Sequence, residues 1–348
     1  MKVIHGFYDE LIKIENIFLA WKLFRSGKTR KKDVVHFEYN LENNLFTLHD
    51  ELRTLTYRHG NYERFIINDP KKREIHKATI IDRIVHTLVA KSLEKIYEPV
   101  FIKNSYSCRV NKGIHGALND IVISTRKSSN NYSKNFWYLK CDIKQFFANI
   151  DHRTLIDVLK KKIKDEKLLW LLNQTIGSYN KNPNKGLPLG NFTSQWLANI
   201  YLNELDYYVK HELRIKFYYR YADDFLIFNS NRKYLELYYN NIEKFLYNKL
   251  RLNFHKGKTV FSKFNRGIDF VGYRILPHYI IIRKKLRKRM IKKVNNSMMS
   301  FVKQEIGYCQ HYERLNSYLG WLKHCSGYKL SNNLIHKIDQ YAKIGKIY

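Results

Sequence analysis

The alternation of apolar and polar residues predicts a β-hairpin near the middle of the chain. Aromatic and aliphatic side chains dominate residues 216–220 and again residues 225–228, and a Tyr-Ala-Asp-Asp segment lies between them. Two such runs joined by a short polar connection are typical of paired strands with a tight turn. Another short apolar run, residues 137–141, is followed by the acidic residue Asp142. Aspartate is also common in ordinary turns, because its side chain hydrogen-bonds the local backbone.

Apolar residues at steps of three and four predict several amphipathic helices. The first is a single N-terminal helix, whose apolar stripe is Phe7, Leu11, Ile14, Phe18 and Trp21. Asp151 is the expected N-cap of a later helix, because its carboxylate can accept from free backbone N–H groups of the first turn. A long helix from Thr193 to about Leu213 is expected after a Gly-, Pro- and Asn-rich loop at 178–191. Further helices are predicted over residues 235–246 and 283–301.

The charge of the chain indicates a polyanionic partner. Its 348 residues contain 63 Lys and Arg against 31 Asp and Glu, a formal net charge of +32. Such an excess of one sign favours nucleic acid, and the aromatic residues interleaved with the basic ones suit base stacking. Much of the Lys, Asn, Ile and Tyr usage is open to a second explanation, compositional bias of the source genome.

Neither a membrane protein nor a secreted one is expected. No apolar stretch approaches the roughly 18 residues that a membrane span requires, and the N-terminus lacks a signal-peptide pattern. The four cysteines show neither zinc-site spacing nor a disulfide framework, so we expect reduced thiols. These features together predict a cytoplasmic protein that binds no membrane.

Three acidic residues are the candidate catalytic groups. Asp142 ends one predicted strand, while Asp223 and Asp224 lie in the hairpin turn. Carboxylates on neighbouring strands are suited to hold two divalent cations roughly 3.5–4 Å apart, which assist in-line transfer at phosphate. Oxygen ligands favour Mg²⁺, with Mn²⁺ as an alternative. The sequence therefore predicts a two-metal nucleotidyltransferase.

The order of these motifs resembles that of reverse transcriptases. The blocks that carry the resemblance are residues 72–83, 140–147, 221–224 and 267–273, within a similarity that extends over about residues 50–325. The resemblance implies an α+β right-hand polymerase, with a small antiparallel palm sheet packed on helices. It also implies an N-terminal helical segment at 1–50, fingers at 51–135, a palm at 136–276 and a helical thumb at 277–348.

The same resemblance implies roles for individual residues. The metal would be bound by Asp142, Asp223, Asp224 and the backbone carbonyl of Ile143, and Lys258 would protonate the departing pyrophosphate. The expected nucleotide-binding residues are Lys72, Arg73, Phe147, Leu189 and Gly190. The expected primer grip is Phe270, Val271, Gly272 and Tyr273. Contacts to the nucleic-acid backbone are expected from Arg283, Lys284, Lys285, Arg287, Lys288 and Arg289.

Alternatives remain for three of these assignments. Asp142 is otherwise a strand-end acid paired with Lys140 or Lys144. Phe147, expected to exclude the 2′-hydroxyl of a ribonucleotide, is otherwise a core residue beside Phe146. For any single basic residue, the alternative is a solvated surface charge.

The loop at 186–195 is similar to that of one subgroup of the family. Leu189 stands where intron-encoded enzymes usually carry glutamine, and Ser-Gln at 194–195 replaces their Ser-Pro. This resembles the reverse transcriptases of diversity-generating retroelements, which mutate adenines while copying. The resemblance implies as partners a template RNA, a cDNA primer–template duplex, dNTPs and a pentameric basic accessory protein.

Leu189 is the position in that loop that leads to the most specific functional hypothesis. An aliphatic side chain cannot hydrogen-bond near the nascent base pair, so we hypothesise that Leu189 contributes to errors at template adenines. A packing leucine is the alternative. Two other functions stay open at this point: an antiphage-defence reverse transcriptase, and a non-catalytic RNA-binding module with a polymerase-like fold.

Overall fold

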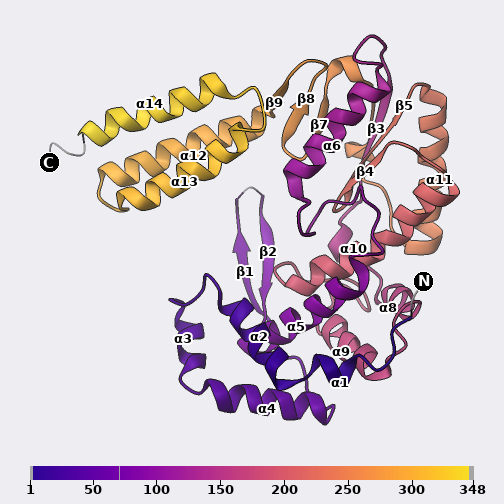
Figure 1. The fold of residues 1–348 in the computed structure, drawn as a ribbon, viewed down its shortest axis with the longest axis vertical. Helices are drawn as coiled ribbons and strands as arrows, with labels where there is room; N and C mark the ends of the chain where they lie inside the picture. The colour runs from indigo at the N-terminus through magenta and orange to yellow at the C-terminus, as the bar shows by residue number, and fades with distance from the viewer. Residues whose placement is uncertain (1–2, 70, 345–348) are drawn as a thin grey trace. The chain divides into compact units, whose positions relative to one another are not determined.

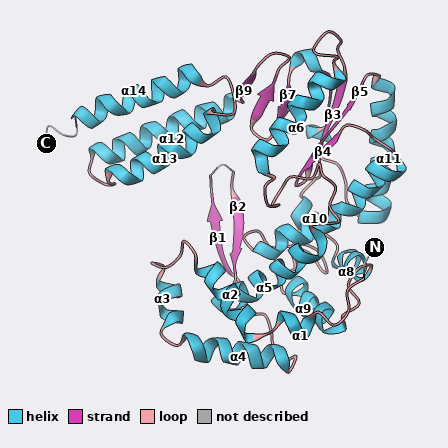
Figure 2. Cartoon of the chain, in the orientation of Figure 1, coloured by secondary structure: helices cyan, strands magenta, loops and turns pink. Residues whose placement is uncertain are grey.

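The computed structural model describes residues 3–69 and 71–344. The chain forms two compact units (Figure 1), which we call unit 1 and unit 2. Unit 1 comprises Met1–Val110, Cys141–Phe225 and Leu237–Thr259, and unit 2 comprises Asn111–Lys140, Leu226–Glu236 and Val260–Tyr348. Helices predominate over strands in the chain (Figure 2).

The N-terminal part of unit 1 consists of the short helices α1 (Tyr8–Leu11), α2 (Ile14–Arg25), α3 (Lys32–Glu38) and α4 (Leu41–Arg53). The prediction of one continuous N-terminal helix is therefore wrong. The backbone is extended at Lys13, with φ −49° and ψ 139°, which separates α1 from α2. The buried residues of α2 are consequently Ile17, Ala20, Trp21 and Phe24.

An exposed hairpin and a buried helix follow. Strands β1 (Glu63–Ile67) and β2 (Arg73–Lys77) pair antiparallel, with Glu63 opposite Lys77. Helix α5 (Ile80–Tyr97) begins after Thr79, whose side chain accepts a hydrogen bond from the backbone N–H of Asp82. Most of α5 is buried, and it packs against α2 and α10 (Phe192–Tyr207).

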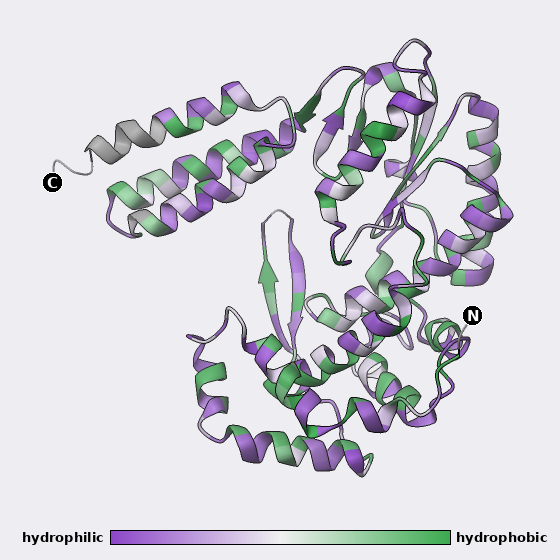
Figure 3. Ribbon diagram, in the orientation of Figure 1, coloured by the Kyte–Doolittle hydropathy of each residue, from purple (hydrophilic) through white to green (hydrophobic). Residues whose placement is uncertain are grey.

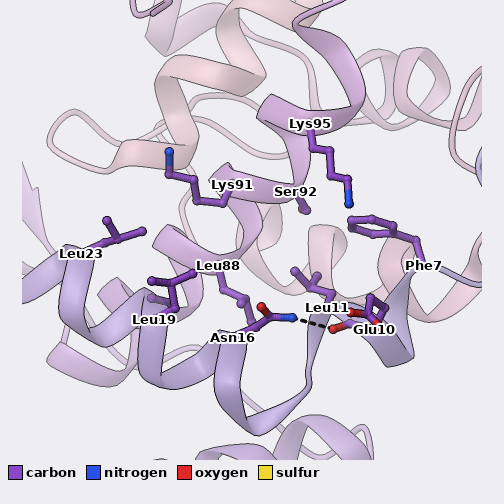
Figure 4. Close-up of a pocket in the computed structure, with 11 residues that line it drawn as sticks. Phe7, Glu10, Leu11, Asn16, Leu19, Leu23, Leu88, Lys91, Ser92 and Lys95 are labelled. Atoms are coloured by element: carbon purple, nitrogen blue, oxygen red, sulfur yellow. Dashed lines mark hydrogen bonds between the residues drawn. The ribbon is translucent and has the colours of Figure 1, made fainter.

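A cavity of about 190 Å³ lies between α2 and α5 (Figure 4). Leu19 and Leu23 line it from α2, and Lys91 and Lys95 line it from α5. The ammonium of Lys95 lies 5.5 Å from the centre of the Phe7 ring. No residue predicted to be part of the functional site lines this cavity.

The central sheet has the strand order β4-β5-β3-β6. Its members are β3 (Trp137–Asp142), β4 (Tyr218–Tyr221), β5 (Asp224–Asn229) and β6 (Val260–Lys263). Strands β4 and β5 are neighbours joined by two residues, which confirms the predicted hairpin. Strands β3 and β6 are antiparallel, with Trp137 opposite Lys263.

The segment between β3 and β4 contains four helices: α7 (Phe146–Asn149), α8 (His152–Lys160), α9 (Glu166–Gly177) and α10. Helix α11 (Arg232–Leu250) lies between β5 and β6 in the sequence. Asp151 caps α8 by accepting from the backbone N–H of Thr154, as predicted. The expected long helix is α10, and a π-helical turn at Tyr208–Glu212 continues it. Short 3-10 turns occur at Lys256–Lys258 and Phe264–Arg266.

Unit 2 contains α6 (Gly113–Ser128) and a three-stranded antiparallel sheet of β7 (Ile268–Phe270), β8 (Tyr273–Ile275) and β9 (Ile280–Ile282). Helices α12 (Lys284–Val302), α13 (Tyr308–Leu322) and α14 (Tyr328–Ile344) pack on one another. Hydrophilic and hydrophobic residues alternate along α12 (Figure 3), and the predicted apolar stripe includes the buried residues Met290, Val294 and Met298. Within the described ranges, every helix is too short or too polar to cross a lipid bilayer.

Asp165 joins the N-terminal segment to α9. One carboxylate oxygen accepts from the backbone N–H of Leu168, at 3.1 Å, and so caps the helix. The other accepts from the backbone N–H groups of Phe7, at 2.6 Å, and Tyr8, at 2.8 Å. Asp165 is buried, so water cannot replace these bonds if the carboxylate is removed.

Asp165→Ala should lower the free energy of unfolding by about 3 kcal/mol, because it removes a helix cap and leaves two N–H groups unpaired. Chemical denaturation measures this change. The control is Glu166→Ala at the exposed neighbouring position, which should change stability by less than about 0.5 kcal/mol. Equal effects of the two substitutions would contradict the assigned role of Asp165.

Candidate active site

The structure brings the three candidate aspartates to neighbouring strands. Asp142 is the last residue of β3, Asp223 lies in the turn after β4, and Asp224 is the first residue of β5. Strands β3 and β5 are adjacent in the sheet. The backbone N–H of Ile143 donates to the backbone carbonyl of Asp223 at 3.3 Å, so the two chain segments touch at the predicted site.

Negative charge is concentrated at this point. The pKa of Asp223 is raised from 3.8 to about 6, chiefly by burial and then by the charges of Asp142 and Asp224. Burial removes the water that would stabilise the carboxylate, and neighbouring anions oppose its ionisation further. A bound cation would favour the ionised carboxylate and so oppose both effects. A carboxylate whose pKa is raised in this way is a candidate metal ligand.

Lys258 neutralises part of this charge. Its ammonium lies 2.8 Å from each carboxylate oxygen of Asp142. The segment that carries Lys258 is fixed to β3, because the backbone N–H of His255 donates to the carbonyl of Asp142 at 2.8 Å. Asp142 is therefore paired with Lys258, a residue that the sequence alternatives of Lys140 and Lys144 did not include. Lys140 instead lies with its ammonium 5.9 Å from the centre of the Phe270 ring.

The donor chemistry of the site fits a divalent cation. Carboxylate oxygens and a backbone carbonyl are the hard ligands that Mg²⁺ favours. The ammonium of Lys258 already occupies a cation position on Asp142. As the side chains stand, residues 3–69 and 71–344 contain no group of three or more His, Cys, Asp or Glu arranged to hold a metal ion. Coordination through these two oxygens would compete with the ammonium of Lys258 for their lone pairs.

The predicted nucleotide-binding residues come from three connected segments of unit 1. Lys72 and Arg73 are exposed beside and within β2. The loop at 187–190 is tied to α7 by the backbone bond from Leu187 to Phe147, at 2.8 Å. It is tied to β2 by the bond from the His76 N–H to the Leu189 carbonyl, at 3.1 Å.

Gly190 allows the loop to approach β2 closely. Its φ is +118°, and an added Cβ would lie 2.9 Å from Cγ2 of Ile75. Both facts favour glycine here, since other residues avoid this conformation. Phe147 is half-buried and meets Phe146 edge to face, whereas Phe146 is fully in the core. The ring of Phe147 is thus partly accessible, as a role in nucleotide selection requires.

A buried hydrogen-bond network beside this loop was not predicted. His86 on α5 lies 2.7 Å from the hydroxyl of Thr193, and its Nε2 accepts from the side-chain amide of Asn191 at 3.0 Å. His59 is 3.1 Å from the same nitrogen. Burial lowers the pKa of His86 to about 3, so the ring is neutral. The only sequence signal was a histidine within an apolar helix, which periodicity does not interpret.

The remaining predicted residues lie in unit 2. Phe270 and Tyr273 of the expected primer grip are fully buried, so only Val271 and Gly272 at the turn offer accessible surface. An added Cβ on Gly272 would lie 2.8 Å from the ring of Trp321. Most of the basic residues expected on the nucleic-acid backbone are exposed at the start of α12; these are Arg283, Lys284, Lys285, Arg287 and Lys288, with Arg289 half-buried.

Known proteins with a similar structure or sequence support a polymerase fold for this chain. A structure of apo telomerase from Candida tropicalis, truncated from its C-terminal domain, is similar with a TM-score of 0.50 and 13% identity, covering 67% of this chain and 59% of that chain. The sheet with acidic residues at neighbouring strand ends and this likeness define the right-hand polymerase fold that the sequence predicted. The family described as Reverse transcriptase (RNA-dependent DNA polymerase) matches residues 68–275, and the chain belongs to it.

Two relatives illustrate the range of the family. Group II intron-encoded protein LtrA of Lactococcus lactis subsp. cremoris is 27% identical, in a match that covers 60% of this chain and 45% of that protein. Protein YkfC of Escherichia coli strain K12 is 25% identical, with 66% of this chain and 70% of that protein covered. The chain therefore spans less than half the length of LtrA.

Asp223→Asn should stabilise the metal-free protein at pH 7.5 but not at pH 4. The stability that Asp223 contributes is fully present below pH about 4 and is lost as the pH rises through about 6, because the folded-state pKa is the higher one. The shift corresponds to up to about 3 kcal/mol. Urea unfolding in EDTA, compared between variant and wild type across this range, measures the difference.

Asp157→Asn, at an exposed position of α8, is the matched control and should follow the wild-type profile. A difference between Asp223→Asn and wild type that does not change with pH would contradict the raised pKa of Asp223.

Proposed function

We propose that the protein is an RNA-directed DNA polymerase, in which a primer 3′-hydroxyl attacks the α-phosphate of an incoming dNTP. The observation that carries this proposal concerns Asp142 and Asp223, which are 81 positions apart in a reverse transcriptase domain. Asp142 ends strand β3, and Asp223 lies in the turn that leads into the adjacent strand β5. Its substrates would be a template RNA, a primer–template duplex and dNTPs.

The residues of this chain would position the reactants. Asp142, Asp223, Asp224 and the carbonyl of Ile143 would ligate two Mg²⁺ ions, with Mn²⁺ as a substitute. When bound, these ions supply positive charge to the attacking and leaving oxygens. Lys258 would release Asp142 and donate its proton to the departing pyrophosphate. This role is supported by the contacts of 2.8 Å between the ammonium of Lys258 and both carboxylate oxygens of Asp142.

Substrate contacts would come from the surrounding segments. Lys72 and Arg73 would bind the triphosphate, since a guanidinium offers paired donors to phosphate oxygens. Phe147 would exclude the 2′-hydroxyl. The exposed basic residues at the start of α12 would bind the duplex backbone, with an affinity that falls steeply with salt. We retain fingers, palm and thumb at the boundaries expected from the sequence as part of this proposal.

We propose further that this is the error-prone enzyme of a diversity-generating retroelement. Support comes from Leu189, whose backbone is fixed by its bond to His76 while its side chain stays half-exposed beside the expected nucleotide site. A side chain held there but unable to hydrogen-bond would not resist weak pairing geometry. A pentameric basic accessory protein and a cytoplasmic location belong to the same proposal.

Primer extension tests the polymerase proposal. The wild-type protein with Mg²⁺, dNTPs and a primed RNA should extend the primer. Removing a residue that only hydrogen-bonds a metal ligand lowers activity by up to about a hundredfold. Substitution of a ligand itself, by Asp142→Asn or Asp223→Asn, should therefore lower primer extension by more than that. Asp157→Asn is the control and should retain activity. Equal extension by wild type and Asp223→Asn would overturn the proposal.

Sequencing of the cDNA tests the role of Leu189. Leu189→Gln should reduce errors at template adenines several-fold, since a hydrogen bond worth about 1 kcal/mol corresponds to roughly fivefold. Errors at the other three template bases should change little. Leu189→Met keeps an apolar side chain and should retain the wild-type error spectrum. Unchanged adenine errors in Leu189→Gln would reduce Leu189 to a packing residue.

A further inference from the structure

A fully buried ion pair lies directly behind the catalytic turn. Arg220, the third residue of β4, and Asp206 on α10 both have no exposed surface. The guanidinium donates to the two carboxylate oxygens of Asp206 at 2.7 and 2.6 Å. Burial lowers the pKa of Arg220, but the charge of Asp206 more than offsets this, so the guanidinium stays protonated. Two charges are thus buried in a core that hydrophobic residues would fill at lower cost.

The guanidinium uses all of its donors. Besides the two bonds to Asp206, it donates to the side-chain oxygen of Asn199 at 3.1 Å and to the hydroxyl of Ser105 at 3.0 Å. The fifth bond goes to the backbone carbonyl of Ala222 at 3.2 Å. An arginine has five N–H groups, and each has an acceptor here. Four of these bonds connect parts of the scaffold, and the fifth reaches the catalytic turn itself.

The fifth bond acts on a strained residue. Ala222 has a φ of +53°, a left-handed conformation that costs a residue with a side chain about 1–2 kcal/mol. Because the peptide unit is planar, fixing the carbonyl of Ala222 also fixes the N–H and Cα of Asp223. The direction in which the Asp223 carboxylate leaves the backbone therefore depends on this bond.

A neighbouring segment supports the same arrangement. The backbone N–H of Arg220 donates to the carbonyl of Asn104 at 2.9 Å, and its carbonyl accepts from the N–H of Tyr106 at 3.0 Å. Asn199 holds this segment as well, since its amide donates to the carbonyl of Ser107 at 2.8 Å. The side chain of Arg220 thus leaves a backbone whose N–H and carbonyl are both bonded to the segment 104–106.

We propose that Arg220 is a positioning residue for catalysis, which aims the Asp223 carboxylate by holding the carbonyl of Ala222. The proposal rests on the proposed polymerase function of the same site. It explains why the core contains a buried ion pair: a hydrophobic side chain would fill the space but could not donate to the turn. A purely structural role would instead require only volume and packing.

A triple variant separates the two roles. Arg220→Met, Asp206→Leu and Tyr218→Phe together remove both charges and the tyrosine hydroxyl that donates to Asp206 at 2.7 Å, while keeping apolar volume. Such replacements of buried ion pairs are often neutral for stability. We expect a folded protein whose kcat for primer extension falls at least about tenfold, since small misplacements at a reacting centre cost up to about a hundredfold. The KM for dNTP should change little, and the Mg²⁺ concentration for half-maximal rate should rise.

Arg220→Lys is the second variant and decides the matter if the triple variant does not fold. It retains a cation for Asp206 but has three donors in place of five. Its kcat should fall as in the triple variant. Arg83→Met is the matched control, because it removes a partly buried guanidinium that pairs with Asp33 at 3.0 Å. It should lower stability and leave kcat unchanged.

Wild-type kcat and Mg²⁺ dependence in either folded Arg220 variant would overturn the proposal. Failure of the wild-type protein to extend any primer would instead overturn the polymerase function. Binding of Mn²⁺, followed by the rise in melting temperature on titration, then still tests Arg220. The positioning role predicts weaker Mn²⁺ binding in the Arg220 variants than in Arg83→Met, and equal binding would exclude it.

Discussion

Mutual repulsion of carboxylates at one place in the fold is the constraint that shapes the rest of the site. Asp142, Asp223 and Asp224 lie close together at the ends of β3 and β4 and the start of β5, and burial keeps water from stabilising the charge of Asp223. The protein compensates in two ways. Lys258, on the 3-10 turn at Lys256–Lys258, neutralises Asp142. The buried guanidinium of Arg220 holds the other turn, between β4 and β5, through the carbonyl of Ala222. These two features offset the unfavourable concentration of negative charge, which a bound cation would relieve further.

The substrate side of the site depends on backbone bonds more than on side chains. The loop at 187–190 is joined to β2 through His76 and to α7 through Phe147, and Gly190 lets it lie against Ile75. Backbone hydrogen bonds therefore connect the three segments that carry the basic residues of β2, the ring of Phe147 and Leu189. A shift of β2 would be transmitted directly to Leu189, so the proposed triphosphate binding and base selection would be mechanically linked in unit 1.

Local sequence signals predicted local structure well and long-range pairing poorly. The hairpin, the cap at Asp151 and the apolar stripe of α12 follow from spacing alone, because each depends on residues within a few positions. The N-terminal helix was predicted as continuous because the periodicity runs through Lys13, where the backbone breaks. Lys258 received its expected role only from the family resemblance, and its pairing with Asp142, 116 positions away, was not predicted. Arg220 was missed altogether, since nothing beside it in the sequence marks a buried charge.

The ion pair of Lys258 and Asp142 would affect binding of the divalent ions proposed for this site. Because the carboxylate already has a counterion, an ion that binds it would compete with the ammonium of Lys258. The affinity for the ion would then include the cost of weakening the pair, and it would be lower than the carboxylates alone would give. The ammonium would remain beside the bound ion, with phosphate oxygens of the incoming nucleotide as its next partners. Uptake of the ion and recognition of the nucleotide would therefore reinforce one another through a single lysine.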